Sequence, residues 1–487
     1  MEQESRGVKK IATGIDGFDT MLEGGIPQGR VVLVTGSAGT GKTVLLNEFI
    51  FRGITEYGEH GVFVTFEEVP SDISQNVANF GWDYEQLQRE GKLLFVDLSP
   101  MRELPEEISN DYDLSPIILR IKQAVKKIDA RRVVLDSIAS LFMQLTNRDK
   151  VRNIIYQICQ ELKGIGVTGM ISSEQPDTGN ISSGYGVEEF VSDGVIQMRI
   201  IPGEQQLIRK MLVTKMRGVG YRSGYVQFAV TSRGLRVFPK IAVQRGIANT
   251  DFTERKKTGI AGLDTALDGG IPKGHVVLIS GTTGSGKTLS CMQFLEEGIR
   301  SGEKGLYVAL EEPVQQVIKT GELHGWDLAE NVEAGDLRFV TGDLIDFVPD
   351  EILSDIVNAV EETGAKRVVV DSISSIMSAT MQQESVRQFL LQLANYFKYK
   401  GITSILSFLM SANFGAEKDQ LLSALETNTM RLSSVVDGVI LLQYVERKQR
   451  VEKLLNILKM RGCSHSKDIF QYEIETGGLS IGKKFEL

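Results

Sequence analysis

Two stretches of this sequence carry the residue types and spacing of a phosphate-binding loop. Both fit the pattern G-x-x-x-x-G-K-[ST], in which glycines let backbone N–H groups surround the phosphates, the lysine reaches the β and γ oxygens, and the last hydroxyl ligates Mg²⁺. We therefore predict two sites for ATP, each with Mg²⁺ as cofactor. The predicted nucleotide-binding residues are Gly36, Ser37, Ala38, Gly39, Thr40, Gly41, Lys42, Thr43 and Val44 in the first copy, and Gly281, Thr282, Thr283, Gly284, Ser285, Gly286, Lys287, Thr288 and Leu289 in the second.

Each loop stands between an apolar strand and a helix. Residues 31–34 and 276–279 are runs of Val, Leu and Ile, which are typical of buried strands, and helical patterns follow from Val44 and Leu289. A phosphate bound by either loop would lie at a helix N-terminus, where free N–H groups and the helix dipole favour negative charge. This context distinguishes both loops from glycine-rich turns without a ligand.

An aspartate ends a further apolar run in each half. Asp136 follows residues 131–135, and Asp371 follows residues 366–370. An acid at the carboxyl end of a buried strand, beyond a phosphate loop, is the usual partner of Mg²⁺. The alternative for each aspartate is a helix N-cap, because a serine comes next. The predicted metal residues are Thr43, Asp136, Thr288, Glu311 and Asp371.

Two adjacent glutamates follow another strand in each half, Glu67-Glu68 and Glu311-Glu312. Adjacent side chains at a strand tip point in opposite directions. One carboxylate of each pair can therefore face the γ-phosphate and take a proton from an attacking water or hydroxyl. We expect this strand to adjoin the strand of the phosphate loop, which favours a catalytic role. The alternative is a solvated acidic turn before a proline.

A lysine and an arginine two residues apart recur near the end of each half, within strand-like segments. Side chains at i and i+2 of a strand share one face. Such a pair could clamp the phosphates of a neighbouring subunit's nucleotide, as an arginine finger does in oligomeric ATPases. The alternative is an exposed basic strand edge that guards against aggregation. The residues are Lys215, Met216 and Arg217, and Lys459, Met460 and Arg461.

The two halves of the chain are copies of one another. Residues 13–43 and 258–288 are identical at 20 of 31 positions, and later motifs recur with a period near 244 residues. This period is too long for a solenoid repeat, so it indicates a duplicated domain. We place the boundary in the polar run around 244–250, which gives domains 1–245 and 246–487.

Within each half, short β-branched runs alternate with helical patterns. This alternation predicts an α/β fold with a mostly parallel sheet covered by helices on both faces. In the first half we expect strands near 31–35, 62–66, 93–97, 132–136, 167–172 and 194–200, and helices near 43–55, 71–79, 115–128 and 150–163.

The composition of the 487 residues is that of an ordinary globular protein. The formal net charge of −9 argues against non-specific binding to nucleic acid or to anionic membranes. The three cysteines, Cys159, Cys291 and Cys463, are widely spaced, which is typical of a reducing compartment. The sequence shows neither an apolar signal region nor an apolar run of 18 residues, so we expect a cytoplasmic protein that does not bind membranes.

In combination these motifs resemble the two-domain KaiC family of RecA-like ATPases. The resemblance rests on the T-G-I-x-G-x-D segment that opens each half, the phosphate loops, the glutamate pairs, the Asp-Ser strand ends and the K-x-R-G tail, and it covers nearly the whole chain. It implies two tandem RecA-like P-loop domains in a double-ring homohexamer, with ATP bound between subunits. It also implies a slow ATPase in the N-terminal ring, and ATPase, serine autokinase and autophosphatase activity in the C-terminal ring, which together serve as a timing or signalling hub.

The same resemblance assigns roles to single residues. Glu67 and Glu311 would be the catalytic carboxylates, and the two K-x-R pairs would contact the neighbour's nucleotide. Ser433 and Ser434 fall where the family carries its phosphoacceptor pair. The first half has Glu189-Phe190 at that place, so only the second domain offers hydroxyl acceptors. The alternative is that both serines are ordinary strand-start or cap residues.

Two departures from the family pattern bear on partners. The acceptor pair is Ser-Ser where clock members have Ser-Thr, which could alter the order of phosphorylation. The chain ends at Leu487, soon after residues 477–479, so we do not expect the long tail through which clock members bind KaiA. The sequence leaves open whether a KaiB-like regulator binds the N-terminal ring.

Two alternative functions share the nucleotide motifs. One is a DNA-acting ATPase of the RecA or RadA type. Its pore loops would need basic residues, but residues 164–198 contain no Lys or Arg and residues 401–430 contain only Lys418, so DNA binding is not expected. The other is a nucleotide-gated scaffold with little hydrolysis, which the sequence does not separate from an active enzyme.

Overall fold

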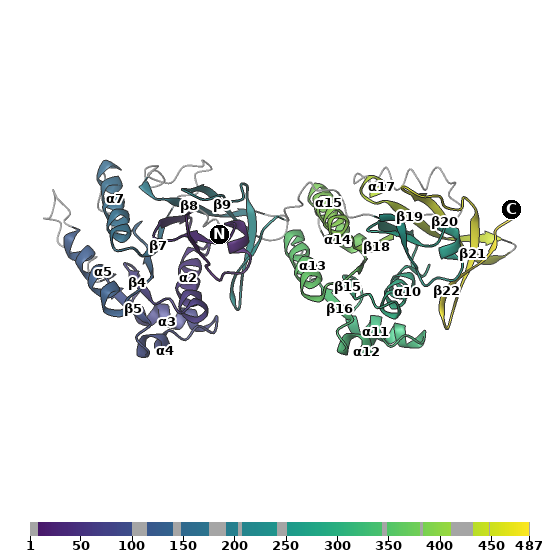
Figure 1. Ribbon diagram of the computed structural model, residues 1–487, viewed down its shortest axis with the longest axis horizontal. Helices are drawn as coiled ribbons and strands as arrows, with labels where there is room; N and C mark the ends of the chain where they lie inside the picture. Colours follow the sequence, from purple (N-terminus) through teal and green to yellow (C-terminus); the bar gives the residue numbers. More distant parts are fainter. Residues whose placement is uncertain are drawn as a thin grey trace, which may run out of the picture. The chain divides into compact units, whose positions relative to one another are not determined.

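The structure is a computed structural model of the whole chain (Figure 1). The chain divides into two compact units, Met1–Lys240 and Ile241–Leu487. The domain boundary predicted at residues 245 and 246 lies outside the described residues. These are 8–99, 114–139, 148–174, 191–202, 207–240, 251–342, 348–379, 383–410, 432–447 and 449–486.

The first unit is built on a nine-stranded sheet in the order β11-β10-β9-β8-β3-β7-β6-β4-β5. The strands from β5 to β8 in this order are parallel, and β9, β10 and β11 extend one edge as antiparallel neighbours. The strands are β3 (Val31–Gly36), β4 (Gly61–Thr65), β5 (Leu93–Asp97), β6 (Arg132–Asp136), β7 (Thr168–Glu174), β8 (Gly194–Pro202), β9 (Leu207–Met216), β10 (Val226–Thr231) and β11 (Gly234–Phe238), with a separate hairpin of β1 (Lys10–Ile11) and β2 (Ile26–Pro27).

Helices cover both faces of this sheet. Apolar residues of α1, α2, α3 and α4 form the core on one face, and those of α5 and α7 form the core on the other. The helices are α1 (Phe18–Met21), α2 (Lys42–Tyr57), α3 (Pro70–Ala78), α4 (Tyr84–Arg89), α5 (Ser115–Ile128) and α7 (Arg148–Gly164).

The second unit repeats this plan, with a nine-stranded sheet in the order β16-β15-β17-β18-β14-β19-β20-β21-β22. Its strands are β12 (Asp251–Lys256), β13 (Ile271–Lys273), β14 (Val276–Gly281), β15 (Gly305–Ala309), β16 (Leu337–Thr341), β17 (Arg367–Asp371), β18 (Thr403–Leu409), β19 (Gly438–Arg447), β20 (Arg450–Met460), β21 (Ile469–Glu475) and β22 (Gly478–Lys484). Its helices are α9 (Leu263–Ala266), α10 (Lys287–Arg300), α11 (Val314–Leu323), α12 (Leu328–Glu333), α13 (Pro349–Thr363), α14 (Ile373–Ala379), α15 (Gln383–Lys400) and α17 (Leu432–Val435).

The predicted α/β fold is confirmed, and one expectation about its topology is wrong. We expected the strand before Glu67-Glu68 to adjoin the strand of the phosphate loop. In the structure β7 and β6 lie between β3 and β4. A sequence pattern identifies parallel strands but not their lateral order, because that order is set by which crossover connections pack.

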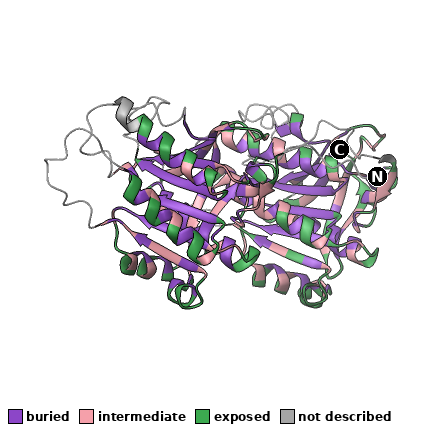
Figure 2. Cartoon of the chain, turned by 60° about the vertical axis from the view of Figure 1, so that its left-hand side comes forward, coloured by how far each residue is buried: buried purple, intermediate pink, exposed green. Residues whose placement is uncertain are grey.

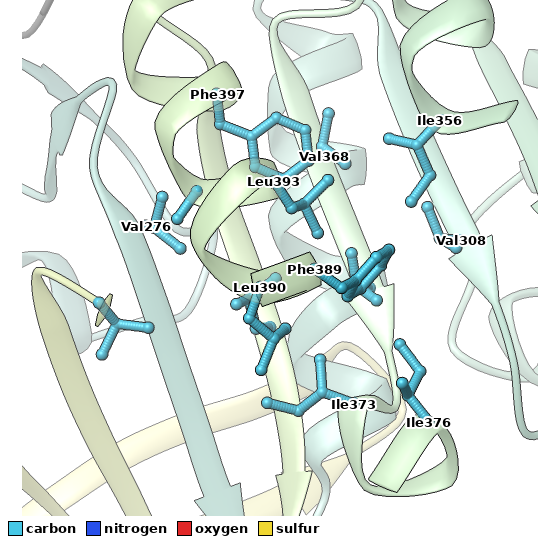
Figure 3. Packing of buried hydrophobic residues seen from close by; sticks show 14 of the residues in the cluster. Val276, Val308, Ile356, Val368, Ile373, Ile376, Phe389, Leu390, Leu393 and Phe397 are labelled. Atoms are coloured by element: carbon cyan, nitrogen blue, oxygen red, sulfur yellow. The ribbon is translucent and has the colours of Figure 1, made fainter. Parts of the chain in front are cut away.

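The central strands are buried on both faces, which explains their continuous apolar sequences. The ribbons of the sheets are largely buried while the helices expose one side (Figure 2). Figure 3 shows one such core, in which Phe389, Leu393 and Phe397 of α15 pack over Val276 and Val368 of the sheet. No helix in the described part of the chain is long and apolar enough to cross a membrane.

A fully buried arginine at the start of a central strand ties the beginning of the T-G-I-x-G-x-D segment to the phosphate-loop helix. Arg132 donates hydrogen bonds to the carbonyl oxygens of Ala12 and Phe49, at 2.7 and 2.9 Å, and to a carboxylate oxygen of Glu59 at 2.7 Å. Its guanidinium also lies 4.6 Å from the centre of the Phe49 ring. The second unit repeats this arrangement at Arg367. In each unit this segment is therefore held against the helix that follows the phosphate loop.

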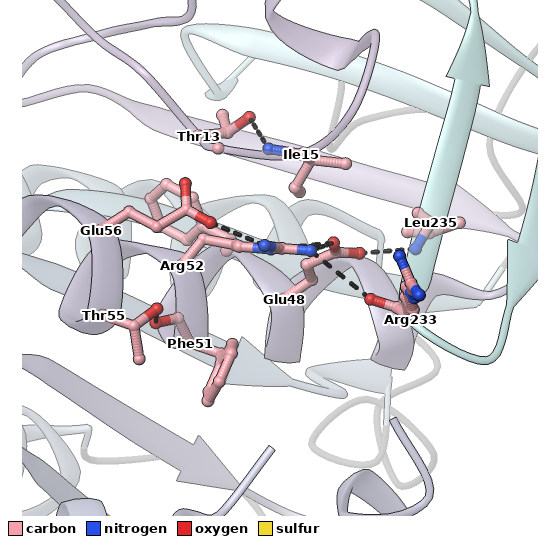
Figure 4. A network of polar contacts seen from close by, with 12 residues as sticks. Thr13, Ile15, Glu48, Phe51, Arg52, Thr55, Glu56, Arg233 and Leu235 are labelled. Carbon is pink, nitrogen blue, oxygen red and sulfur yellow. Dashed lines mark hydrogen bonds and ion pairs between the residues drawn. The ribbon is translucent and has the colours of Figure 1, made fainter. Parts of the chain in front are cut away.

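A buried glutamate joins α2 to β11 in the first unit only. One carboxylate oxygen of Glu48 accepts the backbone N–H of Leu235 at 2.6 Å, and the other lies 3.3 Å from Arg52, which also binds Glu56 (Figure 4). Burial raises the pKa of Glu48 to about 7, although these contacts oppose the rise. The second unit has Gln293 at this place, and its neutral amide accepts the N–H of Leu479 at 2.9 Å.

We expect the free energy of unfolding of the first domain to fall as pH rises from about 4.5 to about 7. The pKa of Glu48 is raised in the folded state, so the folded chain binds the proton more tightly and loses that advantage as the carboxyl ionises. Glu48→Gln should remove this slope and stabilise the domain above pH 7 by on the order of 2–3 kcal/mol.

Urea unfolding at several pH values measures this effect, with Trp82 fluorescence reporting the first domain in a Trp326→Phe background. The matched control is Gln293→Glu, which should introduce the same slope in the second domain, followed through Trp326. An unchanged pH slope in Glu48→Gln would contradict the assignment.

Candidate nucleotide sites

The first phosphate loop connects β3 to α2, as the sequence pattern predicts. Gly39 and Gly41 have φ values of 78° and 101°, a backbone region that favours glycine. A Cβ on Gly36 would lie 2.5 Å from the carbonyl oxygen of Met198, so only glycine fits there. The second loop has the same constraint, because a Cβ on Gly281 would lie 2.6 Å from the carbonyl oxygen of Leu442.

The lysine of each loop turns back onto its own loop, and Lys42 is buried while Lys287 is half-buried. Lys42 Nζ donates to the carbonyl oxygens of Gly36 and Ser37 at 2.8 and 2.9 Å, and Lys287 Nζ donates to that of Thr282 at 2.9 Å. Burial lowers the pKa of both lysines, while nearby carboxylates partly offset this. Each ammonium group thus stands in the loop, in a poorly hydrated place where a phosphate oxygen can replace the carbonyl contacts.

Asp136 lies next to the first loop, at the carboxyl end of β6. Its carboxylate accepts hydrogen bonds from the hydroxyls of Ser172 on β7 and Thr43. Burial raises the pKa of Asp136, and these two bonds and the charge of Lys42 lower it again. The structure therefore brings together three residues that the sequence predicts for the site, namely Lys42, Thr43 and Asp136.

Asp371 has the equivalent place in the second unit but different partners. Its Oδ1 accepts the hydroxyl of Ser407 on β18, and its Oδ2 accepts the phenol of Tyr307 on β15 at 2.7 Å. Burial lowers the pKa of Lys287 and the negative charge of Asp371 opposes that fall, so the two groups interact. Tyr307, Ser172 and Ser407 were not predicted from the sequence. Serines near the end of the apolar runs of β7 and β18 were the available signal for two of them.

The donor set around each loop fits Mg²⁺ bound with a nucleotide. Among the described residues there is no cluster of three or more His, Cys, Asp and Glu side chains that could hold a metal alone. Mg²⁺ keeps several waters and is bound by one or two protein oxygens together with substrate phosphates. Thr43 with Asp136, and Thr288 with Asp371, are oxygen donors of this kind.

The two glutamates after β4 have different surroundings. Three carboxylates oppose the fall in the pKa of Lys42 that burial causes, in the order Glu174, Asp136 and Glu67, so Glu67 is one of the acids around the loop lysine. Glu68 is exposed, and its Oε2 accepts a hydrogen bond from Asn76 of α3 at 3.2 Å. In the second unit Glu311 acts on Lys287 in the same way. The pKa of Glu312 is raised, chiefly by burial and to a smaller extent by the negative charges of Asp371 and Glu311.

The K-x-R residues lie at the other end of the sheet. Met216 pairs with Gly194, which pairs with Val32 near the start of β3, whereas the phosphate loop follows the end of β3. Four residue steps along β3 separate Val32 from Gly36, the first residue of the loop, or about 13 Å. Lys215 Nζ donates to the carbonyl oxygen of Ser192 at 2.7 Å. The structure therefore does not bring Lys215, Met216 and Arg217 to the loop of their own subunit.

The second unit places Lys459, Met460 and Arg461 in the same way, with Lys459 Nζ donating to Val436 at 2.9 Å. The predicted acceptor serines are near them, in α17. Arg461 donates to the carbonyl oxygen of Ser434 at 3.4 Å, and Ser434 is exposed. The side chain of Ser433 lies outside the described residues, as do Glu189 and Phe190 and most of the loops compared for DNA binding.

Comparisons with known proteins agree with this geometry. The family model for the KaiC ATPase matches the chain twice, over residues 11–242 and 256–486. The chain belongs to the KaiC ATPase family. It is 34% identical over 486 residues to the circadian clock protein KaiC3 of Synechocystis sp., covering 100% of this chain and 94% of that protein. It is 35% identical over 485 residues to the circadian clock oscillator proteins KaiC of Rippkaea orientalis and of Thermosynechococcus vestitus, covering 99% of this chain and 91% of each.

Family membership gives the loops their ligand class, because a KaiC ATPase binds and hydrolyses ATP. A phosphate loop of this kind offers its backbone N–H groups and its lysine to phosphate oxygens, and a carboxylate close to that lysine can accept the proton of an attacking water. Mg²⁺, where it is bound, neutralises charge on the phosphates. Glu67 is a better candidate for the general base than Glu68, because Glu67 is the one whose charge acts on Lys42.

We expect Glu67→Gln to reduce ATP hydrolysis in the first domain by about 10²–10⁴-fold while leaving ATP binding intact. The substitution removes a base and preserves the shape and the phosphate loop. Steady-state turnover in a Lys287→Ala background, where the second site is silenced, measures the first domain. Glu68→Gln is the matched comparison, and we expect a much smaller loss. Equal losses in the two variants, or no loss in Glu67→Gln, would contradict the assignment.

Proposed function

We propose that this chain is an ATP-dependent homohexameric ATPase and serine autokinase, in which each nucleotide is bound by the phosphate loop of one subunit and clamped by the K-x-R pair of the next. The observation that carries the proposal is the position of both K-x-R pairs, at the end of the sheet opposite to their own loop. A cation there cannot reach the nucleotide of its own domain, and the proposal assigns it to the nucleotide of a neighbouring copy.

The geometry of the second unit supports phosphoryl transfer as well as hydrolysis. Ser434 is exposed beside Arg461, at the same end of the sheet as the proposed clamp. A serine brought there against a neighbour's γ-phosphate could replace water as the nucleophile. Its oxygen would attack the phosphorus, the bond from phosphorus to the ADP oxygen would break, and Glu311 of the subunit that holds the ATP would take the hydroxyl proton. Autophosphatase activity would return the site to free serine.

The proposal extends to a timing or signalling role, because the relatives are named circadian clock proteins. Phosphate on Ser433 or Ser434 would add about −1.5 to −2 charges beside Arg461, at the proposed subunit boundary. Such a change can shift how neighbouring subunits pack. A KaiB-like regulator on the N-terminal ring and a cytoplasmic location belong to the same proposal.

We expect saturating nucleotide to assemble the chain into a hexamer. Nucleotide that binds across a subunit boundary stabilises the assembled state by mass action. Native mass spectrometry with and without a non-hydrolysable ATP analogue measures the distribution of states. Lys42→Ala/Lys287→Ala is the control and should not assemble with nucleotide. A wild-type chain that stays monomeric at saturating analogue would contradict the proposed ring.

We expect incubation with Mg·ATP to place phosphate on Ser433 or Ser434, as intact mass and peptide mapping would show. Glu311→Gln and Lys287→Ala should each abolish the modification because one removes the base and the other the phosphate-loop cation. Ser433→Ala/Ser434→Ala should stay unmodified. If the serines remain bare while ATP turns over in assembled wild-type rings, the protein is an ATPase without kinase activity.

Mixed subunits test whether transfer occurs between neighbours. Lys287→Ala keeps the acceptors but lacks the donor site, and Ser433→Ala/Ser434→Ala keeps the donor site but lacks the acceptors. Neither should be phosphorylated alone. After mixing in the presence of ATP, phosphate should appear on the Lys287→Ala chain, which intact mass distinguishes from its partner. If the wild-type control becomes phosphorylated while the mixture stays unmodified, the phosphate is transferred within one subunit.

A further inference from the structure

The two domains differ at one buried position beside the metal-site aspartate. Phe63 on β4 and Tyr307 on β15 are equivalent, four residues before the first glutamate of each pair. Both rings pack in the same way, with centres 5.4 Å from Phe95 and from Phe339 respectively. The difference between the two domains at this place is therefore a single hydroxyl group.

The Tyr307 hydroxyl donates to Asp371 Oδ2 at 2.7 Å, and both residues are buried. A phenol is neutral at physiological pH, so Tyr307 acts as the donor. The other oxygen of Asp371 accepts Ser407, as Asp136 accepts Ser172 in the first domain. Asp136 has the threonine of its own phosphate loop as its other hydroxyl partner.

A carboxylate that accepts a buried hydrogen bond shares its negative charge with the donor and has one fewer lone pair for other ligands. In a poorly hydrated site this loss is not made up by water. Asp136 accepts a hydrogen bond from the threonine that would ligate Mg²⁺, so its negative charge faces the place where the metal would be bound. Part of the negative charge of Asp371 is instead taken up by its hydrogen bond to Tyr307 of β15.

We propose that Tyr307 is a positioning residue that weakens the hold of Asp371 on Mg²⁺, so that the second ATP site needs a higher Mg²⁺ concentration than the first. The proposal rests on the Mg·ATP sites proposed above and does not depend on the kinase activity. Its consequence is that a change in free Mg²⁺ would alter the second domain before the first, although both carry the same loop motif.

The test compares nucleotide affinity in Mg²⁺ with affinity in EDTA. A fluorescent non-hydrolysable ATP analogue is titrated into Lys42→Ala chains, which report the second site, and into Lys287→Ala chains, which report the first. The quantity measured for each site is the ratio of the Kd in EDTA to the Kd in Mg²⁺. A residue with a merely structural role would change both Kd values and leave this ratio unaltered.

In the Lys42→Ala background, Tyr307→Phe should raise the ratio by about three- to tenfold, which is part of the full worth of a hydrogen bond to a charged group. The Kd in EDTA should not change. The reciprocal substitution Phe63→Tyr in the Lys287→Ala background should lower the ratio of the first site by a similar factor. Because both substitutions copy the residue of the sister domain, each is expected to fit its core.

An unchanged or smaller ratio in Tyr307→Phe would overturn the proposal, and so would a loss of affinity in EDTA, which would indicate a structural role. If the Lys42→Ala parent binds the analogue equally well with and without Mg²⁺, the second domain has no metal site, and both the proposed Mg·ATP site and this inference are wrong. This failure can be told apart from a failure of the inference alone, because it appears before Tyr307 is changed.

Discussion

The direction of the strands is the constraint on which both candidate sites depend. In the first unit β3, β4, β6 and β7 run parallel, so their carboxyl ends meet at one edge of the sheet, where the phosphate loop, Asp136 and Glu67 come together. The return of β9 along β8 carries Lys215 and Arg217 to the opposite edge. The unit therefore has a candidate phosphate site at one end of its sheet and a pair of cations at the other, which is the arrangement that the proposed head-to-tail ring requires.

Burial sets the electrostatics at the loop edge. Lys42 and Asp136 both lie where water is scarce, and each moderates the pKa shift that burial imposes on the other. Both charges have polar partners, which are loop carbonyls for Lys42 and hydroxyl groups for Asp136, and such partners offset the cost of burying a charge. A triphosphate at this edge would meet a poorly hydrated cation, and the attraction would be stronger than at an exposed lysine. The buried Arg132, at the opposite end of β6 from Asp136, holds the chain around Ala12 against α2.

Duplication has preserved the backbone of the site while letting single buried groups diverge. The two sheets have the same strand order and the two loops the same glycine constraints, yet Glu48 corresponds to Gln293 and Phe63 to Tyr307. Each exchange nearly keeps the shape of the side chain. The first replaces an ionisable carboxyl by a neutral amide, and the second adds a hydroxyl group to an aromatic ring. Changes of this kind cost little packing energy, so they can adjust pH response or metal affinity in one domain without disturbing the fold.

The sequence by itself determined the α/β class, the duplication and the residues that gather at the loop edge. These features follow from local patterns, because a glycine-rich loop needs its own glycines and a buried strand needs its own apolar run. Only the tertiary structure decided that β7 and β6 separate β3 from β4, that Glu67 rather than Glu68 lies near Lys42, and that Tyr307 binds Asp371. Each of these facts joins residues that are far apart along the chain or that differ only in the direction of a side chain. Packing of the crossover helices fixes such relations, and no local pattern encodes them.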